Sequence, residues 1–259
     1  MPVRAVLLDL DGVLYVEEEP VDGAAAAVEA LRAAGLALRF VTNTTSRPRA
    51  SILERLHRLG FDVADEELLT PAVLAVQLCR SRGHRRVAIL VRDDVRADFA
   101  GLEPPNDDGG ADAVILGDMG DAFDYALLNG AFRQVMDGAE LIALQRNRYW
   151  MTPDGLALDV GPFVAALEYA TRTEAVVVGK PAPAFFATAL ADLGTDPADA
   201  LMVGDDVESD VGGALGSGLA AVLVRTGKYR EDALRASGIE PTAIADSIAD
   251  VPALLARHG

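Results

Sequence analysis

The sequence predicts an α/β fold built on a parallel sheet, with a second α/β domain inserted into it. Three observations predict this class. Short apolar runs rich in Val, Leu and Ala alternate along the chain with segments of helical length. Several of these runs lack polar alternation, as strands buried on both faces of a parallel sheet do. In addition, 137 residues separate Thr42 from Lys180, far more than one crossover between neighbouring strands requires.

The first strand is predicted within residues 3–15, V-R-A-V-L-L-D-L-D-G-V-L-Y, where an apolar run ends in two aspartates. Asp9 is expected at the carboxyl end of this strand, the edge at which open α/β sheets bind ligands. Asp11 points to the same side if the chain is still extended through Leu10, and Gly12 permits a sharp turn after it. Asp and Gly are also ordinary turn residues, so a solvated turn or helix cap is the alternative interpretation.

One strand-helix-strand unit is predicted to separate Asp9 from Thr42. The pattern indicates a helix over 22–34, a strand over 36–41 and a helix over 47–59. The second strand runs into Thr42-Asn43-Thr44-Thr45, and a right-handed crossover places its end on the same sheet edge as Asp9. A run of Thr and Asn is equally common as a cap for the helix that follows.

The inserted domain is predicted to span residues 71–177, and the core to comprise 1–70 and 178–259. Within the insert the pattern indicates another alternation of strands and helices. The predicted elements are helices over 71–82, 123–136 and 160–171, strands over 87–91, 113–116 and 141–150, and a loop over 103–110.

Past the insert, apolar runs at 175–179 and 200–203 predict two further strands of the main sheet. The first runs into Lys180-Pro181, and the second into G-D-D-V-E-S-D, which holds Asp205, Asp206 and Asp210. The remaining predicted elements are a helix over 183–193, strands over 219–224 and 243–245, and a helix over 248–257.

Composition excludes several classes of partner. The formal charge of -17 argues against nucleic acid and against an anionic membrane surface, because clustered Lys and Arg hold both. No stretch approaches the ~20 apolar residues of a membrane span, and no signal segment is recognisable, so a cytoplasmic location is expected. Cys79 is the single cysteine and cannot form an internal disulfide. Arg accounts for 21 of the 23 basic residues, which leaves Lys180 and Lys228 as the lysines.

The predicted strand ends carry a set of polar groups that suits phosphoryl chemistry. They are Asp9 with Asp11, Thr42 with Asn43, Lys180, and Asp205 with Asp206 and Asp210. Converging carboxylates repel one another unless a cation lies among them, and oxygen ligands of this kind favour Mg²⁺. A hydroxyl, an amide and an ammonium complete a pocket for a phosphoryl dianion. The sequence therefore predicts a magnesium-dependent site for a small phosphorylated compound.

Electrostatics outlines the mechanism at such a site. Two like unit charges 4 Å apart repel by ~4 kcal/mol at an effective dielectric constant of 20, so an ionised Asp cannot approach a phosphoryl dianion unaided. Mg²⁺ and Lys180 offset that repulsion. Asp9 can then attack phosphorus and form an aspartyl phosphate, while Asp11 protonates the leaving oxygen and later takes a proton from water.

The motifs D-L-D-G-V-L-Y, V-T-N-T-T, G-K-P and G-D-D-V-E-S-D resemble, in this order, the four motifs of the haloacid dehalogenase-like (HAD) superfamily of phosphatases. The insert resembles the large α/β cap of the NagD-type branch, with a Rossmann-like core. R-F-V-T-N-T-T, L-D-V-G-P-F-V-A-A-L-E-Y-A, V-V-G-K-P and V-R-T-G-K-Y-R resemble most the phospholysine phosphohistidine inorganic pyrophosphate phosphatases and their haloacid dehalogenase-like domain-containing sister group.

The resemblance implies a role for each matching residue. Asp9 is implied as the nucleophile and Asp11 as the acid and base. The implied metal ligands are the Asp9 carboxylate, the Asp11 backbone carbonyl and Asp205. Phosphoryl binding is implied for Thr42, Asn43 and Lys180, and an outer-shell role that orients metal-bound water for Asp206 and Asp210.

Two features depart from the relatives. Some close relatives carry Ser where this chain has Asp11, so hydrolysis of poor leaving groups becomes more plausible here. The predicted cap segment 145–150 has Tyr149 in place of the Asp of a common Asn-x-Asp pattern. The sugar phosphate and pyridoxal phosphate substrates of relatives with that pattern are therefore not inferred for this chain. This segment is expected to cover the site and contribute to specificity.

Two alternative functions fit the pattern less well. Carbon-halide hydrolysis by the same Asp nucleophile is disfavoured, because that reaction needs neither a metal cluster nor a second Asp. A binding or regulatory protein that senses a phosphorylated ligand with little turnover is disfavoured by the intact set of polar groups. The resemblance also implies a homodimer that pairs through the cap.

Overall fold

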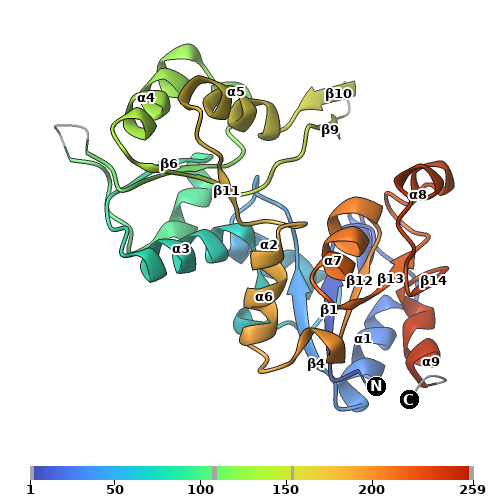
Figure 1. Cartoon of the computed structure of the whole chain (residues 1–259). Helices are drawn as coiled ribbons and strands as arrows, with labels where there is room; N and C mark the ends of the chain where they lie inside the picture. Colours follow the sequence, from blue (N-terminus) through green and yellow to red (C-terminus); the bar gives the residue numbers. More distant parts are fainter. Residues whose placement is uncertain (1–2, 107–109, 153–154, 257–259) are drawn as a thin grey trace. The chain divides into compact units, whose positions relative to one another are not determined.

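The computed structural model describes residues 3–106, 110–152 and 155–256. These residues form two compact units (Figure 1). The first comprises residues up to 42 together with 52–69 and the chain from 180 onward, and the second comprises 43–51 and 70–179. Among the described residues, no helix is both long enough and apolar enough to cross a membrane.

The first unit is built on a six-stranded parallel sheet with the order β14-β13-β12-β1-β4-β5. The strand bounds are β1 Ala5–Asp9, β4 Ala37–Val41, β5 Leu68–Leu69, β12 Ala200–Gly204, β13 Ala220–Val224 and β14 Ala243–Ala245. A short antiparallel pair, β2 Tyr15–Val16 and β3 Glu19–Pro20, follows β1. The predicted parallel sheet is confirmed, because all of these strands pair in parallel. β1 lies near the centre of the sheet, between β12 and β4.

Helices flank this sheet. They are α1 Ala24–Ala33, α6 Pro183–Ala191, α7 Gly213–Gly216, α8 Glu231–Ser237 and α9 Val251–Ala256, with a π-helical turn at Val207–Gly212. Helix α2, Arg49–Arg58, begins in the second unit and continues in the first. Buried side chains of α1 and α9, such as Val28 and Val251, share one apolar core with Val6 and Leu8 of β1. Burial on both faces explains why β1 shows no polar alternation before Asp9.

The second unit has its own parallel sheet, with the order β11-β8-β7-β6. The strand bounds are β6 Val87–Leu90, β7 Ala113–Leu116, β8 Glu140–Ala143 and β11 Val176–Val177. Its helices are α3 Pro71–Arg82, α4 Tyr125–Met136 and α5 Gly161–Thr171. β9 Tyr149–Thr152 pairs antiparallel with β10 Gly155–Leu158. The fold is thus a Rossmann-like parallel core with an inserted α/β domain, as the sequence predicts.

One strand prediction is wrong. Residues 175–179 were expected to form a strand of the main sheet, but β11 pairs with β8 in the sheet of the second unit. Lys180 therefore does not follow a strand of the sheet that carries Asp9. The run 141–150, predicted as strand material, contributes to two strands, β8 and β9. The predicted loop at 103–110 and final helix at 248–257 extend in part outside the described residues.

Asp112 stabilises the start of β7 in the second unit. Its Oδ2 accepts hydrogen bonds from the backbone N–H groups of Arg85 (2.8 Å) and Arg86 (2.9 Å), and its Oδ1 lies 3.2 Å from the Arg86 guanidinium. The Arg86 and Arg85 backbone bonds lower the pKa of Asp112 to about 2. These bonds to the ionised form are therefore present at neutral pH.

We expect Asp112→Asn to lower the free energy of unfolding by about 1 kcal/mol at pH 7, after allowance for solvent screening. Because the pKa of Asp112 is lower in the folded state, its contribution is complete above about pH 4 and disappears as the pH falls to 2. Urea unfolding of both proteins across this range measures the difference, with the exposed Asp121→Asn as control. A difference that stays constant down to pH 2 contradicts this account.

Candidate active site

Two neighbouring strands of the main sheet end in buried carboxylates. β1 ends at Asp9, which is 6% exposed, and Asp205 follows directly after β12 and is 1% exposed. Leu8 pairs with Val203, so the two aspartates lie close to the same level of the sheet. On the other side of β1, Asp9 pairs with Val41, and the buried Thr42 comes next in the chain. The carboxyl edge of the sheet therefore gathers these three side chains as predicted.

A tight turn follows Asp9 and carries Asp11. Gly12 has a φ of +86° and donates its N–H to the Tyr15 carbonyl at 2.7 Å. The buried Tyr15 hydroxyl donates to Asp11 Oδ2 at 3.4 Å. The Arg55 guanidinium lies 4.3 Å from the centre of the Tyr15 ring, which is a cation-π distance. The Asp11 carboxylate is thus held by a side chain that is itself fixed by packing.

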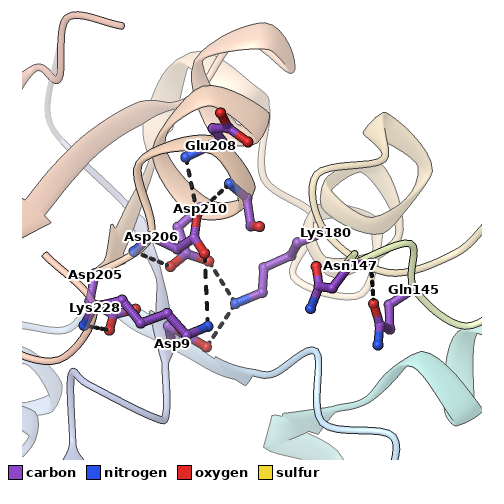
Figure 2. A network of polar contacts seen from close by, with 10 residues as sticks. Asp9, Gln145, Asn147, Lys180, Asp205, Asp206, Glu208, Asp210 and Lys228 are labelled. Carbon is purple, nitrogen blue, oxygen red and sulfur yellow. Dashed lines mark hydrogen bonds and ion pairs between the residues drawn. The ribbon is translucent and has the colours of Figure 1, made fainter. Parts of the chain in front are cut away.

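Lys180 lies at the centre of a buried ionic cluster (Figure 2). Its Nζ donates to Asp9 Oδ1 at 2.7 Å and lies 2.6 Å from Asp210 Oδ1. The Lys180 side chain is 2% exposed. Burial lowers the pKa of Lys180, but the charges of Asp210 and Asp9 outweigh it and hold that pKa above its usual range. Lys180 therefore remains an ammonium at neutral pH. It reaches this cluster even though the strand that precedes it belongs to the other sheet.

The segment after β12 positions its acidic residues differently from one another. Asp210 is buried in the cluster, and its Oδ2 accepts the backbone N–H of Asp206 at 3.1 Å. Asp206 Oδ1 instead accepts the backbone N–H groups of Glu208 (3.0 Å) and Ser209 (2.9 Å), which begins the π-helical turn. Asp206 is thus a capping residue, and Asp210 is the one of the two that contacts Lys180.

Burial raises the pKa of each carboxylate in the cluster. The pKa of Asp205 rises to about 6 because of burial and the nearby Asp210 charge. Burial and the Asp9 charge raise the pKa of Asp210 to about 7. The pKa of Asp9 is also raised by burial, although Lys180 opposes the shift. The charge of Lys228 also acts on these carboxylates, but two ammonium groups do not compensate for three carboxylates, so the cluster favours a further cation.

The donor set fits a divalent metal ion. Carboxylate oxygens of Asp9, Asp205 and Asp210 lie within 4.8 Å of one another. Asp205 Oδ1 is buried and accepts no hydrogen bond within the described part of the chain. An oxygen-only site with an unsatisfied carboxylate oxygen is the chemistry that Mg²⁺ prefers.

Asn43 lies in the second unit, although it follows Thr42 directly in the chain. It packs beside Gly179: a Cβ placed on Gly179 would lie 2.8 Å from Asn43 Oδ1 and would overlap the Leu144 carbonyl oxygen. Asn43 and Gly179 are therefore neighbours where the chain enters and leaves this unit. Its predicted phosphate-binding role stays a prediction.

The predicted specificity segment, residues 145–150, comprises most of the connection between β8 and β9 and the first two residues of β9. The buried Gln145 donates from Nε2 to Asp159 Oδ1 at 2.5 Å. Its Oε1 accepts the Asn147 backbone N–H at 2.5 Å (Figure 2). The Gly161 N–H donates to the Asn147 carbonyl at 3.0 Å. Asp159 thus fixes the start of this segment, a contact between distant residues that sequence patterns do not reveal.

Sequence reasoning gave no role to the loop after β13. There the backbone N–H of Lys228 donates to Asp205 Oδ2 at 2.6 Å, and the Thr226 hydroxyl donates to the Gly12 carbonyl. The stretch V-R-T-G-K-Y-R carried a signal only through its resemblance to relatives and through the scarcity of lysine. A backbone donor has no side-chain signature.

Two family models match the chain. Residues 6–103 match the haloacid dehalogenase-like hydrolase model, and residues 177–251 match a HAD-hydrolase-like model. Haloacid dehalogenase-like hydrolase domain-containing protein 2 of Rattus norvegicus is 47% identical over 88% of this chain and 86% of its own length. Phospholysine phosphohistidine inorganic pyrophosphate phosphatase of Bos taurus is 40% identical over 99% of this chain and 95% of its own length.

Solved structures with this fold include other phosphatases. The p-nitrophenyl phosphatase of Archaeoglobus fulgidus has a TM-score of 0.91 at 27% identity and covers 98% of this chain and 100% of that one. NagD of E. coli K-12 has a TM-score of 0.86 at 25% identity, with 96% and 98% covered. A glycerol phosphate phosphatase of Mycobacterium tuberculosis in complex with magnesium has a TM-score of 0.84 at 31% identity, with 98% and 78% covered. The chain therefore belongs to the haloacid dehalogenase-like hydrolases, in the NagD-type group of phosphatases.

Proposed function

We propose that this protein is a Mg²⁺-dependent phosphohydrolase that acts on a small phosphorylated compound through an aspartyl phosphate on Asp9. The observation that carries this proposal is the buried cluster in which Lys180 contacts Asp9 and Asp210, with Asp205 beside them. The substrate class comprises phosphomonoesters, pyrophosphate and compounds with a P–N bond. The magnesium complex of the structurally similar glycerol phosphate phosphatase supports the choice of metal.

Asp9 and Asp205 are proposed to hold Mg²⁺, together with the Asp11 backbone carbonyl and with Asp206 and Asp210 outside them. When bound, Mg²⁺ supplies positive charge that offsets the repulsion between the carboxylates and the phosphoryl group. Lys180, Thr42 and Asn43 are proposed to bind the phosphoryl oxygens. The buried ammonium of Lys180 already lies 2.7 Å from the Asp9 carboxylate, so it can hold both reacting groups together.

The reaction is proposed to proceed in two displacements. An Asp9 carboxylate oxygen bonds to phosphorus while the bond to the leaving group breaks, and Asp11 gives its proton to the departing atom. Water then attacks phosphorus in the aspartyl phosphate, Asp11 takes a proton from it, and phosphate and the free Asp9 carboxylate are released. The hydrogen bond from Tyr15 keeps Asp11 oriented for both transfers.

The test is a phosphate-release screen over small phosphomonoesters, pyrophosphate, phospholysine and phosphohistidine, with Mg²⁺ and with EDTA. We expect one compound or one narrow class to be hydrolysed far faster than the rest, and its turnover to disappear with EDTA. Uniformly feeble or EDTA-insensitive release would contradict the proposal and favour a binding or regulatory protein with little turnover.

Tyr15→Phe is expected to slow hydrolysis of an alkyl phosphate by about 10-fold, because a general acid contributes 10²–10⁴-fold and loses part of that when poorly oriented. The effect on 4-nitrophenyl phosphate should be smaller, since that leaving group needs little protonation. Steady-state kcat values for both substrates test this. An equal loss on both substrates would mean that Tyr15 does not act through Asp11.

Residues 71–177 remain the proposed cap, with the 145–150 segment contributing to specificity. Assembly as a homodimer through this cap, a cytoplasmic location and the absence of nucleic-acid and membrane partners also remain predictions. Size-exclusion chromatography with light scattering tests the dimer directly.

A further inference from the structure

We propose that the loop Thr226-Gly227-Lys228 is a positioning element that fixes the carboxylate of Asp205 for metal binding. This inference rests on the proposed function, because it assigns Asp205 as a metal ligand. The loop follows β13, which is the neighbour of β12 in the main sheet. It therefore approaches Asp205 from the next strand along.

The loop uses one oxygen of Asp205 and leaves the other available. The Lys228 backbone N–H donates to Asp205 Oδ2 at 2.6 Å (Figure 2). Asp205 Oδ1 is buried and accepts no hydrogen bond from the residues described. A carboxylate held at one oxygen has its orientation fixed, so its second oxygen is presented to a cation without further ordering.

Two glycines allow the close approach. Gly227 has a φ of +62°, and a Cβ there would overlap Asp205 Oδ2 and the Cα of Gly12. Gly12 has a φ of +86°, and a Cβ there would also overlap the Asp205 carboxylate. Both positions thus require glycine for conformation and for space. Together they place the backbone of two separate loops directly against one carboxylate.

A hydrogen bond ties this loop to the turn after β1. The Thr226 hydroxyl donates to the Gly12 carbonyl, one residue beyond Asp11. The loop therefore contacts both Asp205 and the turn that follows Asp9. The two strand ends that supply the proposed metal ligands are thus connected through this loop. The loop therefore has a role beyond connecting β13 to α8.

Gly227→Ala and Thr226→Val test the proposal, with the Mg²⁺ dissociation constant as the readout. Isothermal titration of the substrate-free protein with MgCl₂ measures it. Disturbing a residue that orients a metal ligand typically weakens metal binding by about 10–100-fold, which we expect for Gly227→Ala. Thr226→Val should weaken binding by about 10-fold, and Thr226→Ser, which keeps the hydroxyl, should restore it.

Gly238→Ala is the matched control. Gly238 lies in the same unit with a φ of +67°, but a Cβ there would meet no atom within 4 Å. It reports the backbone strain alone, and its Mg²⁺ dissociation constant should equal that of the wild type. In the loop variants, kcat should recover at saturating Mg²⁺, which a general loss of structure would not allow.

The outcomes separate this inference from the proposed function. Wild-type protein that binds no Mg²⁺ overturns both. Wild-type protein that binds Mg²⁺, with Gly227→Ala and Thr226→Val binding it equally well, overturns only the positioning role. If Gly227→Ala does not fold, the comparison of Thr226→Val with Thr226→Ser decides, because neither changes the backbone conformation required at Gly227.

Discussion

Replacing Lys180 with methionine is expected to destabilise the metal-free protein by about 3–5 kcal/mol at pH 7.5, because removing one partner of a buried ion pair leaves uncompensated charge. The Lys180 side chain is 2% exposed and lies 2.7 Å from Asp9 and 2.6 Å from Asp210. Methionine has a similar length but no charge, so Asp9 and Asp210 would repel each other without a counter-ion. Urea unfolding in EDTA measures the loss.

The pH dependence of this loss has a definite sign. The pKa values of Asp205, about 6, and Asp210, about 7, are raised in the folded protein. Protonation of these groups therefore favours the folded state, and the metal-free wild type should gain stability as the pH falls from 7.5 to 5. The variant should gain more, because its carboxylates lack the ammonium, and the difference between the two proteins should narrow.

The contribution of Lys180 itself has the same sign but changes in a higher pH range. Its pKa is raised in the folded state, so its stabilising effect is present below its ordinary pKa of ~10.4 and is lost as the pH rises through the folded value. The ammonium therefore stabilises the fold throughout the neutral range.

Lys228→Met is the comparison variant, because it removes a lysine charge that acts on the same carboxylates from an exposed side chain outside the buried ion pairs. The Lys228 side chain is 65% exposed, and its ammonium lies 3.8 Å from Asp206. An exposed ion pair of this kind contributes ~0–1 kcal/mol. If both lysine variants lose the same stability, or if the Lys180→Met deficit is unchanged between pH 5 and 7.5, the buried ion cluster does not have the energetic role assigned to it.

Sequence patterns predicted the site best where the chain supplies it locally. The apolar run before Asp9 and the run before Asp205 are buried strands, and each places its carboxylate at the strand end by covalent continuity alone. Chain direction and burial fix such a position. Thr42 after β4 follows the same rule, so three of the predicted residues reach one sheet edge.

The same rule failed for Lys180 because strand pairing is a long-range property. Val176 and Val177 have the composition of a buried strand in either sheet, and only their pairing with β8 shows which sheet they join. Lys180 still contacts Asp9, although the two residues are 171 positions apart in the sequence. No local sequence pattern predicts such a contact. β5 was not predicted for a different reason, because a strand of two residues is too short to show periodicity.

The loop after β13 shows a second limit of sequence reasoning. Its contact with Asp205 is made by a backbone N–H, which every residue except proline carries. The requirement for Gly227 follows from a positive φ and from a neighbouring carboxylate, neither of which is visible in one sequence. Only the structure therefore reveals interactions of the backbone with a side chain that is distant in the sequence.

Asp9→Asn is expected to reduce turnover of a generic aryl phosphate by at least about 1,000-fold, because an amide oxygen is a poor nucleophile and losses of this order follow removal of one. The fold should be retained. Asn has the shape of Asp, and its carbonyl oxygen can still accept the hydrogen bond from Lys180. Removing the charge also removes its repulsion of Asp205, so the metal-free variant should melt no lower than the wild type.

Turnover of 4-nitrophenyl phosphate with Mg²⁺ measures the effect, and Asp246→Asn is the matched control. Asp246 lies in the same unit, pairs with Arg225 at the surface and has a side chain that is 81% exposed, so its amide variant should keep wild-type turnover. A labelled phosphoryl group should remain on acid-quenched wild-type protein and be absent from Asp9→Asn. Activity within 10-fold of the wild type, or labelled Asp9→Asn protein, would assign the nucleophile to another residue, and Asp11 on the adjoining turn would be the next to test.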